Sequence, residues 1–252
     1  MTNIRILTYN ILAEVFVKKQ YYPNTSSNLL NYQNRREHTL RVIENSSIDF
    51  IMLQEAQDQD RLQFEKYLSS KYECSTLAAK SEIITARSAG TMSLVSKTWT
   101  GKYDILPVSF DNGKKCQVIN CETPDGKRFS IVNIHLDFNV KEKQFAMLEE
   151  LVFRRFLGPF IIVGDMNATR KEMEKMFEKH ATLKFINAIN GDPDTYFSED
   201  GKGTRQCDHI WIEEGYFQVK SINISNKITD LEECLKQFGS DHAPVEVVIN
   251  IV

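Results

Sequence analysis

The stretch FIIVGDMNAT, residues 160–169, joins an apolar run to a polar end. Its apolar run FIIV predicts a buried strand, which ends at Gly164 and is followed at once by Asp165 and Asn167. Gly, Asp and Asn are common turn residues, so a turn is a sufficient explanation of this stretch taken alone. A carboxylate and a carboxamide at a strand end also suit a functional site. Whether other strands end in the same way decides between the two interpretations.

Other apolar runs predict further buried strands. The expected strands cover residues 4–12, 48–56, 91–97, 116–122, 129–137, 160–168, 207–212 and 243–252. Helical spacing of apolar residues predicts helices over residues 34–46, 141–157, 170–180 and 230–238. Asn112-Gly113 and Asp125-Gly126 are hairpin turn signals. Strands in both helix-separated and hairpin succession predict an α/β or α+β fold with largely antiparallel sheets.

Length and composition describe an ordinary globular chain. It has 252 residues, of which 42% are hydrophobic and 26% are charged. We find no internal repeat and no Pro/Gly-rich linker, so we expect a single domain over residues 1–252. The net charge of -3 argues against a protein that holds nucleic acid by bulk positive charge. It does not exclude an enzyme that meets phosphate through a local metal ion.

Targeting and redox features are few. The start, MTNIRILTYN, has no secretory pattern, and no apolar run approaches the ~20 residues that span a bilayer. The five cysteines are scattered and form no CxxC pair. We therefore expect an intracellular protein, cytoplasmic or nuclear, without a membrane segment or a structural zinc.

Polar side chains with metal-binding or proton-handling chemistry recur at the ends of the expected strands. In chain order they are Asn10, Glu55, His135, Asp165, Asn167, Asp208, Asp241 and His242. Taken singly, each has a structural explanation as a helix cap, an exposed strand end, a core histidine or a turn residue. Strand ends on one edge of a packed sheet converge in space, and ligand sites form there. The whole set therefore predicts a site.

The chemistry of this set favours a hard cation and a phosphate ester. Oxygen ligands suit Mg2+ or Mn2+, and no cysteine belongs to the set, which makes zinc a poorer choice. Hydrolysis of a phosphate ester needs a group that deprotonates water, donors that meet the developing charge, and a group that stabilises the leaving oxygen. Two histidines and spare carboxylates satisfy these needs.

The ordered motifs TYN, LQE, NIH, GDMN, CDHIW and SDH resemble those of the endonuclease/exonuclease/phosphatase superfamily, which has the DNase I-like fold. The resemblance runs from about residue 4 to the C-terminus. It implies a four-layer αββα sandwich of two mixed, largely antiparallel sheets flanked by helices. It also implies metal-dependent cleavage of a phosphate ester, with in-line attack by a metal-activated water.

The resemblance implies a role for each motif residue. Glu55 would be the main ligand of Mg2+, for which Mn2+ can substitute, with Asn10 and Asp241 in the metal region. The implied catalytic residues are His135, Asp165, Asn167, Asp208 and His242. In that set Asp165 orients or deprotonates water, Asn167 and His135 bind the scissile phosphate, and His242 donates to it while paired with Asp208.

Cations near these motifs are candidate phosphate contacts. They are Arg87, Lys114, Lys115, Lys202 and Arg205. A lysine is more often a solvated surface charge. Arg205 is favoured because it lies three residues before Asp208 and because a guanidinium matches phosphate geometry.

The N-terminal third resembles the deadenylase-like branch, which includes nocturnin and Angel proteins. The matching elements are YNILA, Tyr22-Pro23, LNY with Arg35, and LQE. This branch acts on RNA 3′ ends or related phosphates, which implies a 3′-5′ exoribonuclease.

The chain departs from that branch at two positions of its base pocket. Val140 stands where the branch has a proline, and Gly203 stands where it has an aromatic residue. Tyr196 and Phe197 are candidates to replace that aromatic residue, because base stacking contributes ~1–3 kcal/mol per base.

Other functions stay open on the same scaffold. They are a DNA endonuclease, a phosphomonoesterase or cyclic phosphodiesterase, and an inactive member that binds RNA. A full set of motif residues argues against the inactive member. We expect a nucleic-acid substrate, with RNA favoured, and a monomer.

Overall fold

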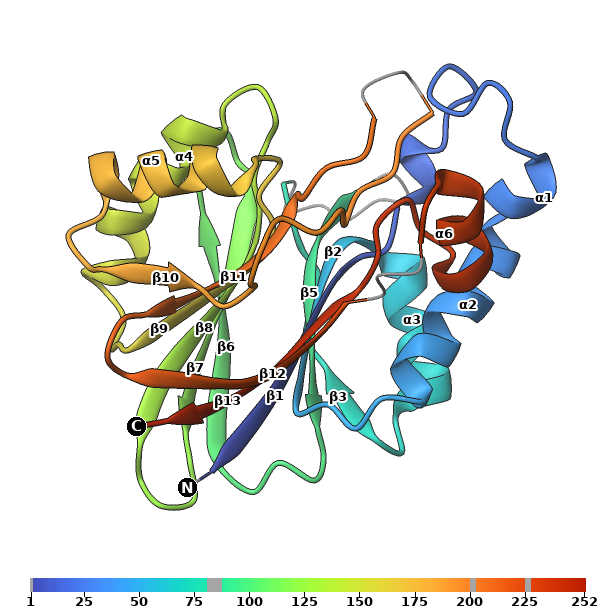
Figure 1. The fold of residues 1–252 in the computed structure, drawn as a ribbon. Helices are drawn as coiled ribbons and strands as arrows, with labels where there is room; N and C mark the ends of the chain where they lie inside the picture. The colour runs from blue at the N-terminus through green and yellow to red at the C-terminus, as the bar shows by residue number, and fades with distance from the viewer. Residues whose placement is uncertain (1, 81–87, 200–202, 225–227) are drawn as a thin grey trace.

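The computed structural model describes residues 2–80, 88–199, 203–224 and 228–252. Two β-sheets pack face to face, and helices cover their outer faces (Figure 1). This is the predicted four-layer sandwich of mixed sheets. No helix within these described ranges has the length and apolarity needed to cross a membrane.

The first sheet has seven strands in the order β12-β13-β1-β2-β5-β3, with β4 also paired to β5. Its strands are β1 (Asn3–Asn10), β2 (Phe50–Gln57), β3 (Tyr72–Cys74), β4 (Ala78–Ala79), β5 (Ala89–Ser96), β12 (Phe217–Ile224) and β13 (Val245–Ile251). Only the β1–β2 pair is parallel among the pairs of this sheet in the described chain.

The second sheet has six strands in the order β10-β11-β9-β8-β7-β6. They are β6 (Lys102–Ser109), β7 (Lys115–Glu122), β8 (Arg128–His135), β9 (Phe160–Asp165), β10 (Phe185–Asn187) and β11 (Asp208–Glu213). The β8–β9 pair is parallel and its neighbours are antiparallel. Both predicted hairpin turns are present, and Gly113 and Gly126 adopt the left-handed backbone that their turns require, with φ of 79° and 82°.

Helices cover the two outer faces separately (Figure 1). Beside the first sheet lie α1 (Ser27–Leu30), α2 (Tyr32–Glu44), α3 (Asp58–Leu68) and α6 (Leu231–Phe238). Beside the second lie α4 (Lys141–Leu148) and α5 (Arg170–His180). The single helix expected over 141–157 is wrong in its second half: α4 passes into a π-helical turn, Glu149–Phe153, in which Arg154 N donates to the carbonyl of Glu149. A short 3-10 helix, Glu14–Phe16, follows β1.

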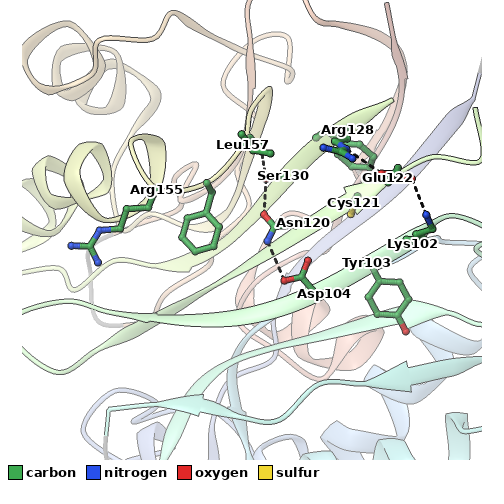
Figure 2. A pocket seen from close by; sticks show the side chains of 12 residues that line it. Lys102, Tyr103, Asp104, Asn120, Cys121, Glu122, Arg128, Ser130, Arg155 and Leu157 are labelled. Atoms are coloured by element: carbon green, nitrogen blue, oxygen red, sulfur yellow. Dashed lines mark hydrogen bonds and ion pairs between the residues drawn. The ribbon is translucent and has the colours of Figure 1, made fainter. Parts of the chain in front are cut away.

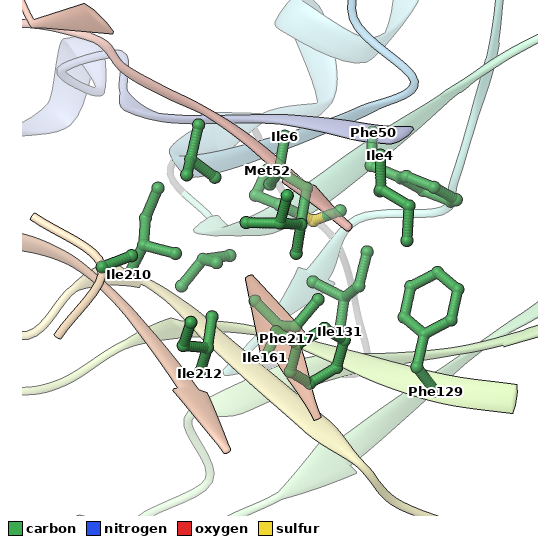
Figure 3. Packing of buried hydrophobic residues seen from close by; sticks show 14 of the residues in the cluster. Ile4, Ile6, Phe50, Met52, Phe129, Ile131, Ile161, Ile210, Ile212 and Phe217 are labelled. Carbon is green, nitrogen blue, oxygen red and sulfur yellow. The ribbon is translucent and has the colours of Figure 1, made fainter. Parts of the chain in front are cut away.

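The core between the sheets is built by every second residue of the central strands. Ile4 and Ile6 of β1 face Ile131 of β8, Ile161 of β9 and Ile210 of β11 in one buried cluster (Figure 3). Towards one end of the sandwich the same inward positions become polar. They are Thr8, Asn10, Gln54, Asn133, His135, Asp165 and Asp208.

Strand pairing brings these polar positions level with one another. Asn10 pairs with Gln54 in the first sheet. In the second sheet Asp165 pairs with both His135 and Asp208. The register that buries the apolar residues therefore also gathers the polar strand ends at one edge of the sandwich.

A hydrogen-bonded layer separates the apolar core from those strand ends. Asn133 Oδ1 accepts from Gln54 Nε2 at 2.9 Å across the two sheets. Asn133 Nδ2 donates to the carbonyl of Met92 at 3.1 Å and lies 3.3 Å from Ser93 Oγ. Asn133 is fully buried, so its carboxamide fixes the sheet-to-sheet distance just below the site.

We predict that Asn133→Leu lowers the free energy of unfolding by about 2–4 kcal/mol, because the buried Gln54 amide and Met92 carbonyl lose their partner. Ile131→Val, in the apolar part of the same strand, is the control and costs about 1 kcal/mol. Urea unfolding of both variants measures the difference. A smaller loss for Asn133→Leu than for Ile131→Val would contradict a role for this layer.

Candidate active site

The side-chain amide of Asn10 joins the two sheets at the polar edge. Asn10 Nδ2 lies 2.9 Å from Asp165 Oδ2 and 3.2 Å from Glu55 Oε1. It also lies 3.5 Å from Nε2 of His242. The Asn10 carbonyl oxygen Oδ1 accepts from Leu12 N at 3.1 Å, so the orientation of the amide is fixed. One buried carboxamide thus holds two carboxylates from different sheets close together.

Glu55 enters the site through a break in strand alternation. Its neighbour Gln54 faces the inter-sheet space, so regular alternation would turn Glu55 away from it. A bulge between Leu53 and Ala56, and a left-handed backbone at Glu55 with φ of 58°, redirect the side chain into the site. Left-handed backbone is unfavourable for a residue with a Cβ, so surrounding contacts must hold it.

One such contact comes from the loop after β1. Ala13 N donates to Glu55 Oε2 at 2.9 Å. Two buried arginines of α2 hold this loop: Arg36 Nη1 donates to the Ile11 carbonyl at 2.6 Å, and Arg35 Nη1 donates to the Leu12 carbonyl at 2.6 Å. Leu12 also has a left-handed backbone, with φ of 52°. The LNY element with Arg35 thus has a structural function, which is to position the loop that supports Glu55.

The GDMN stretch is both a turn and part of the site. Asn167 N donates to Asp165 Oδ1 at 2.9 Å, which closes the turn. Asn167 Nδ2 donates to the Leu136 carbonyl at 2.9 Å and lies 3.3 Å from His135 Nε2. Gly164 is required because a Cβ there would lie 1.9 Å from the Ile134 carbonyl oxygen. The turn therefore holds Asp165 and Asn167 against the neighbouring strand that ends in His135.

His242 forms a buried pair with Asp208. His242 Nδ1 lies 2.8 Å from Asp208 Oδ2, and His242 Nε2 lies 3.7 Å from Asp165 Oδ2. Burial lowers the pKa of His242, but the carboxylates of Asp208 and Asp165 outweigh it and raise the pKa to about 10. Thr195 Oγ1 accepts from Asp208 N at 3.0 Å and holds the strand end in place. His242 is therefore a cation at neutral pH.

His135 is the opposite case. Burial and the nearby charge of Lys114 lower its pKa to about 4, against the smaller opposing effect of Asp165. Its Nε2 lies 3.6 Å from Asp165 Oδ2. His135 is therefore neutral at pH 7, so that its ring offers one donor and one acceptor nitrogen.

Asp241 lies close enough to Glu55 for its charge to act on that carboxyl group. Its Oδ2 accepts from the hydroxyl of Tyr22 at 2.9 Å. Burial raises the pKa of Glu55 to about 7, and the charge of Asp241 adds to this rise. The structure thus brings Asp241 to the site wall, beside the main carboxylate.

Three side chains are spaced as ligands of one cation. One ligand atom each of Glu55, His135 and Asp165 lies within 4.8 Å of the others. Two carboxylates and an imidazole fit a divalent cation, and a divalent cation offsets the repulsion between the carboxylates. Asn10 lies within hydrogen-bond distance of both carboxylates, but Asp241 does not belong to this close group.

These side chains line a cavity of about 580 Å³. Its polar wall consists of Glu55, Lys114, His135, Asp137, Asn139, Asp165, Asn167, Ser198, Glu199, Arg205, Asp241 and His242. Its aromatic wall consists of Phe16, Tyr21, Tyr22, Phe138 and Tyr196. Every residue of the predicted site therefore reaches one cavity, except Asn10 and Asp208, which lie behind it and contact its lining.

Arg205 stacks between two aromatic rings at the cavity wall. Its guanidinium carbon lies 5.1 Å from the ring centre of Tyr196 and 5.6 Å from that of Phe138. Tyr196 in turn lies 4.9 Å from the ring of His242. Phe138 is 52% exposed, and Lys141 Nζ also lies 5.1 Å from the centre of its ring. Sequence reasoning missed Phe138, although an aromatic residue three positions after His135 was a visible signal.

The expectation that Phe197 replaces the missing aromatic residue is wrong, whereas Tyr196 does reach the cavity. Phe197 is 2% exposed and packs in an apolar cluster with Leu12 and Leu235. Arg87 and Lys202, two of the candidate phosphate contacts, lie outside the described residues.

A second hollow, of about 390 Å³, lies on β6, β7 and β8 beside residues 155–157 (Figure 2). Its polar side chains are paired with one another: Asn120 donates to Asp104 at 3.1 Å, and Glu122 accepts from Arg128 at 3.0 Å. It contains none of the predicted site residues, so we assign it no chemistry.

We predict that Glu55→Gln stabilises the metal-free protein at pH 8. The folded-state pKa of Glu55, about 7, lies above its ordinary value of 4.5, so burying its charge destabilises the fold above pH 7. The gain is about 1–3 kcal/mol in EDTA and fades as the pH falls from 7 towards 4.5, where wild-type Glu55 becomes protonated. Urea unfolding at pH 8 and pH 5 measures it. An equal effect of the substitution at both pH values would contradict this assignment.

The arrangement of paired carboxylates and histidines at strand ends agrees with what the sequence comparison finds. Residues 7–242 match the Endonuclease/Exonuclease/phosphatase family, and the chain belongs to this family. Members of the family are hydrolases that act on phosphoester bonds. No curated protein sequence matches the chain.

Solved structures with the same fold include the two relatives that the motifs resemble. ANGEL2, described as a 2′,3′-cyclic phosphatase, superimposes with a TM-score of 0.81 at 15% identity, over 98% of this chain and 95% of ANGEL2. The human nocturnin catalytic domain with bound sulfate gives 0.73 at 18% identity, over 99% and 94% of the two chains. TDP2 of D. rerio with a single-strand DNA product gives 0.71 at 11% identity, over 99% and 100%.

Proposed function

We propose that the protein is a divalent-metal-dependent hydrolase of phosphodiesters that acts on nucleic acid, with RNA favoured, from the 3′ end. The observation that carries this proposal is the juxtaposition of two groups in one cavity. Glu55, His135 and Asp165 are spaced as ligands of a cation, and Asp165 lies 3.7 Å from the Nε2 of the protonated His242. Hydrolysis of a phosphate ester uses a metal ion that activates water and a proton donor for the developing charge. Both groups lie next to the Asp165 carboxylate.

Glu55 would be the main ligand of Mg2+ or Mn2+, with Asp165 beside it and Asn10 and Asp241 in the surrounding shell. When bound, the metal ion supplies a Lewis acid for a phosphoryl oxygen and lowers the pKa of a water molecule. Glu55 contributes a carboxylate whose other oxygen is held by Ala13 N. Its backbone strain serves to place that carboxylate.

Asp165 would orient and deprotonate the attacking water. Burial acts to raise its pKa, but His242 and His135 outweigh burial and hold the pKa below the ordinary range. The carboxylate is therefore ionised at neutral pH. The hydrogen bonds from Asn10 Nδ2 and Asn167 N hold its two oxygens in fixed positions.

His242 would donate to the phosphate as charge develops, and Asp208 would fix its tautomer by accepting from Nδ1. Asn167 and His135, together with Arg205, would bind the scissile phosphate. The neutral ring of His135 suits hydrogen bonding without competing for the proton that His242 carries.

We predict that Asp208→Asn lowers kcat by roughly 10²–10⁴-fold and moves the alkaline limb of the pH profile. The pKa of His242 is raised to about 10 by Asp208 and Asp165, so the donor form persists well above neutral pH. Without the Asp208 charge the pKa falls towards 6.5, and activity is lost at lower pH. A pH–kcat profile of both proteins measures this. An unmoved alkaline limb would show that His242 is not the donor.

A nucleotide substrate is favoured by the aromatic wall. The exposed ring of Phe138 beside the Arg205 guanidinium offers a surface on which a base can stack.

We predict that Phe138→Ala raises KM for a dinucleotide about 10-fold and leaves KM for the matching abasic dinucleotide unchanged. Tyr67→Ala is the matched control, because Tyr67 is also 52% exposed and lies outside the cavity. Tyr67 has Lys66 Nζ over its ring, as Phe138 has Lys141 Nζ. Equal KM changes for both substrates would contradict base stacking at Phe138.

A second candidate is hydrolysis of a 2′,3′-cyclic phosphate at an RNA end. ANGEL2, a structural neighbour, is described as a 2′,3′-cyclic phosphatase. Neither Val140 nor Gly203 supplies a base-stacking ring, so a clamp selective for successive adenosines is not supported. The same cavity residues would serve both reactions.

The deciding experiment is a time course on 5′-labelled RNA with a unique body and a short A tail, in Mg2+, Mn2+ or EDTA, with Glu55→Ala as the inactive control. Shortening from the 3′ end that requires the metal and Glu55 is the expected result. A parallel RNA that ends in a 2′,3′-cyclic phosphate tests the second candidate. Cleavage of plasmid DNA with intact RNA in all lanes would replace the RNA proposal with a DNA endonuclease.

We further propose that the catalytic domain spans residues 1–252 and acts as a monomer. Strands from opposite ends of the chain support this, because β1 pairs with β13 between Asn3 and Asn250. The five cysteines are all free, which suits the reducing cytoplasm or nucleus.

A further inference from the structure

Lys114, one of the lysines that the sequence offered only as a candidate phosphate contact, is a cation in the active-site cavity. It belongs to the hairpin between β6 and β7 and follows the Asn112-Gly113 turn. Its side chain is half-buried and lines the cavity together with Glu55, His135 and Asp165. Four acidic residues besides Asp165 also line that cavity: Glu55, Asp137, Glu199 and Asp241.

The ammonium group of Lys114 is not paired with any residue that the structure describes. Throughout the described ranges, no hydrogen bond or ion pair involves Lys114 Nζ, whereas Lys141 Nζ donates to the Asn167 carbonyl at 2.7 Å and pairs with Glu172 at 3.0 Å. Burial lowers the pKa of Lys114, and the carboxylates of Asp137, Asp165 and Glu55 partly oppose this effect. Withdrawing an ammonium from water without a direct partner is unfavourable. An anionic ligand would supply the partner.

The backbone of Lys114 is held in place relative to the site. Lys114 N donates to Asn112 Oδ1 at 3.2 Å. Asn112 Oδ1 also accepts from Gln144 Nε2 at 3.2 Å, and Gln144 Oε1 accepts from Asp137 N at 2.6 Å. Gln144, which is 2% exposed, therefore ties the hairpin to the loop that directly follows His135. An ordered backbone of this kind suits a residue that must place its charge accurately.

We propose that Lys114 is a further substrate-contacting residue, whose ammonium binds a nonbridging phosphoryl oxygen from the His135 side of the cavity. This rests on the proposed function, since it assumes a phosphate in the same cavity. The contact is electrostatic, and no bond to Lys114 forms or breaks. Lys114 and His135 line the same cavity, so the ammonium would contact the phosphate beside the His135 ring.

The test is the affinity of the Mg2+-loaded protein for inorganic phosphate, measured by calorimetric titration. Lys114→Met should weaken phosphate binding about 10- to 100-fold, and Lys114→Arg should restore most of it. The structure removes Lys115 from the candidate phosphate contacts, because Lys115 does not line the cavity. Lys115→Met is therefore the matched control, since Lys115 is the next residue and is also half-buried. It should leave phosphate affinity unchanged.

A second titration, of Mg2+ alone, separates this role from simple charge balance. If Lys114 served only to offset the carboxylates, Lys114→Met would tighten Mg2+ binding and leave phosphate affinity unchanged, and that result would overturn the proposal. So would the absence of phosphate binding by the wild-type protein. If phosphate binding depends on Lys114 but the protein hydrolyses no ester, the proposed function is wrong and the Lys114 contact is supported. Full hydrolysis and unchanged phosphate affinity in Lys114→Met would overturn the Lys114 contact and leave the proposed function supported.

Discussion

The alternation of side chains along a β-strand is the constraint on which the site depends. Every second residue of β1, β8, β9 and β11 must face the opposing sheet, and for most of each strand that residue is apolar. The same alternation, continued to the strand ends, turns Asn10, His135, Asp165 and Asp208 towards one another. A slip of one residue in register would move each of them to the helix-covered face. The packing of the core and the position of the candidate catalytic groups are therefore set by the same pairing.

The non-glycine residues with a left-handed backbone lie at the site. In the described part of the chain, the three non-glycine residues with positive φ are Leu12, Glu55 and Asn167. Each lies in or next to a segment that holds a carboxylate of the proposed cation site, and each is fixed by hydrogen bonds to other segments. Backbone strain concentrated in this way places side chains that a regular strand would direct elsewhere.

Much of this arrangement was predictable, because strand ends are marked in the sequence by the change from apolar to polar residues. FIIVGDMNAT predicts both β9 and the turn that holds Asp165 and Asn167. Local sequence does not show the bulge at Glu55, because the bulge depends on pairing between β2 and β5. Nor does it show that Phe197 is buried while Tyr196 reaches the cavity, since that depends on how a loop packs on α6. The free Lys114 ammonium was hidden for a similar reason: only the tertiary fold distinguishes it from a surface lysine.

We propose that these strand ends form a divalent-cation site. Anomalous scattering from a crystal soaked in Mn2+ can locate the ion. We expect a manganese peak within coordination distance of Glu55, with Asp165 and His135 around it. A peak elsewhere on the molecule, or none while the soaked protein retains full phosphodiesterase activity, would contradict it.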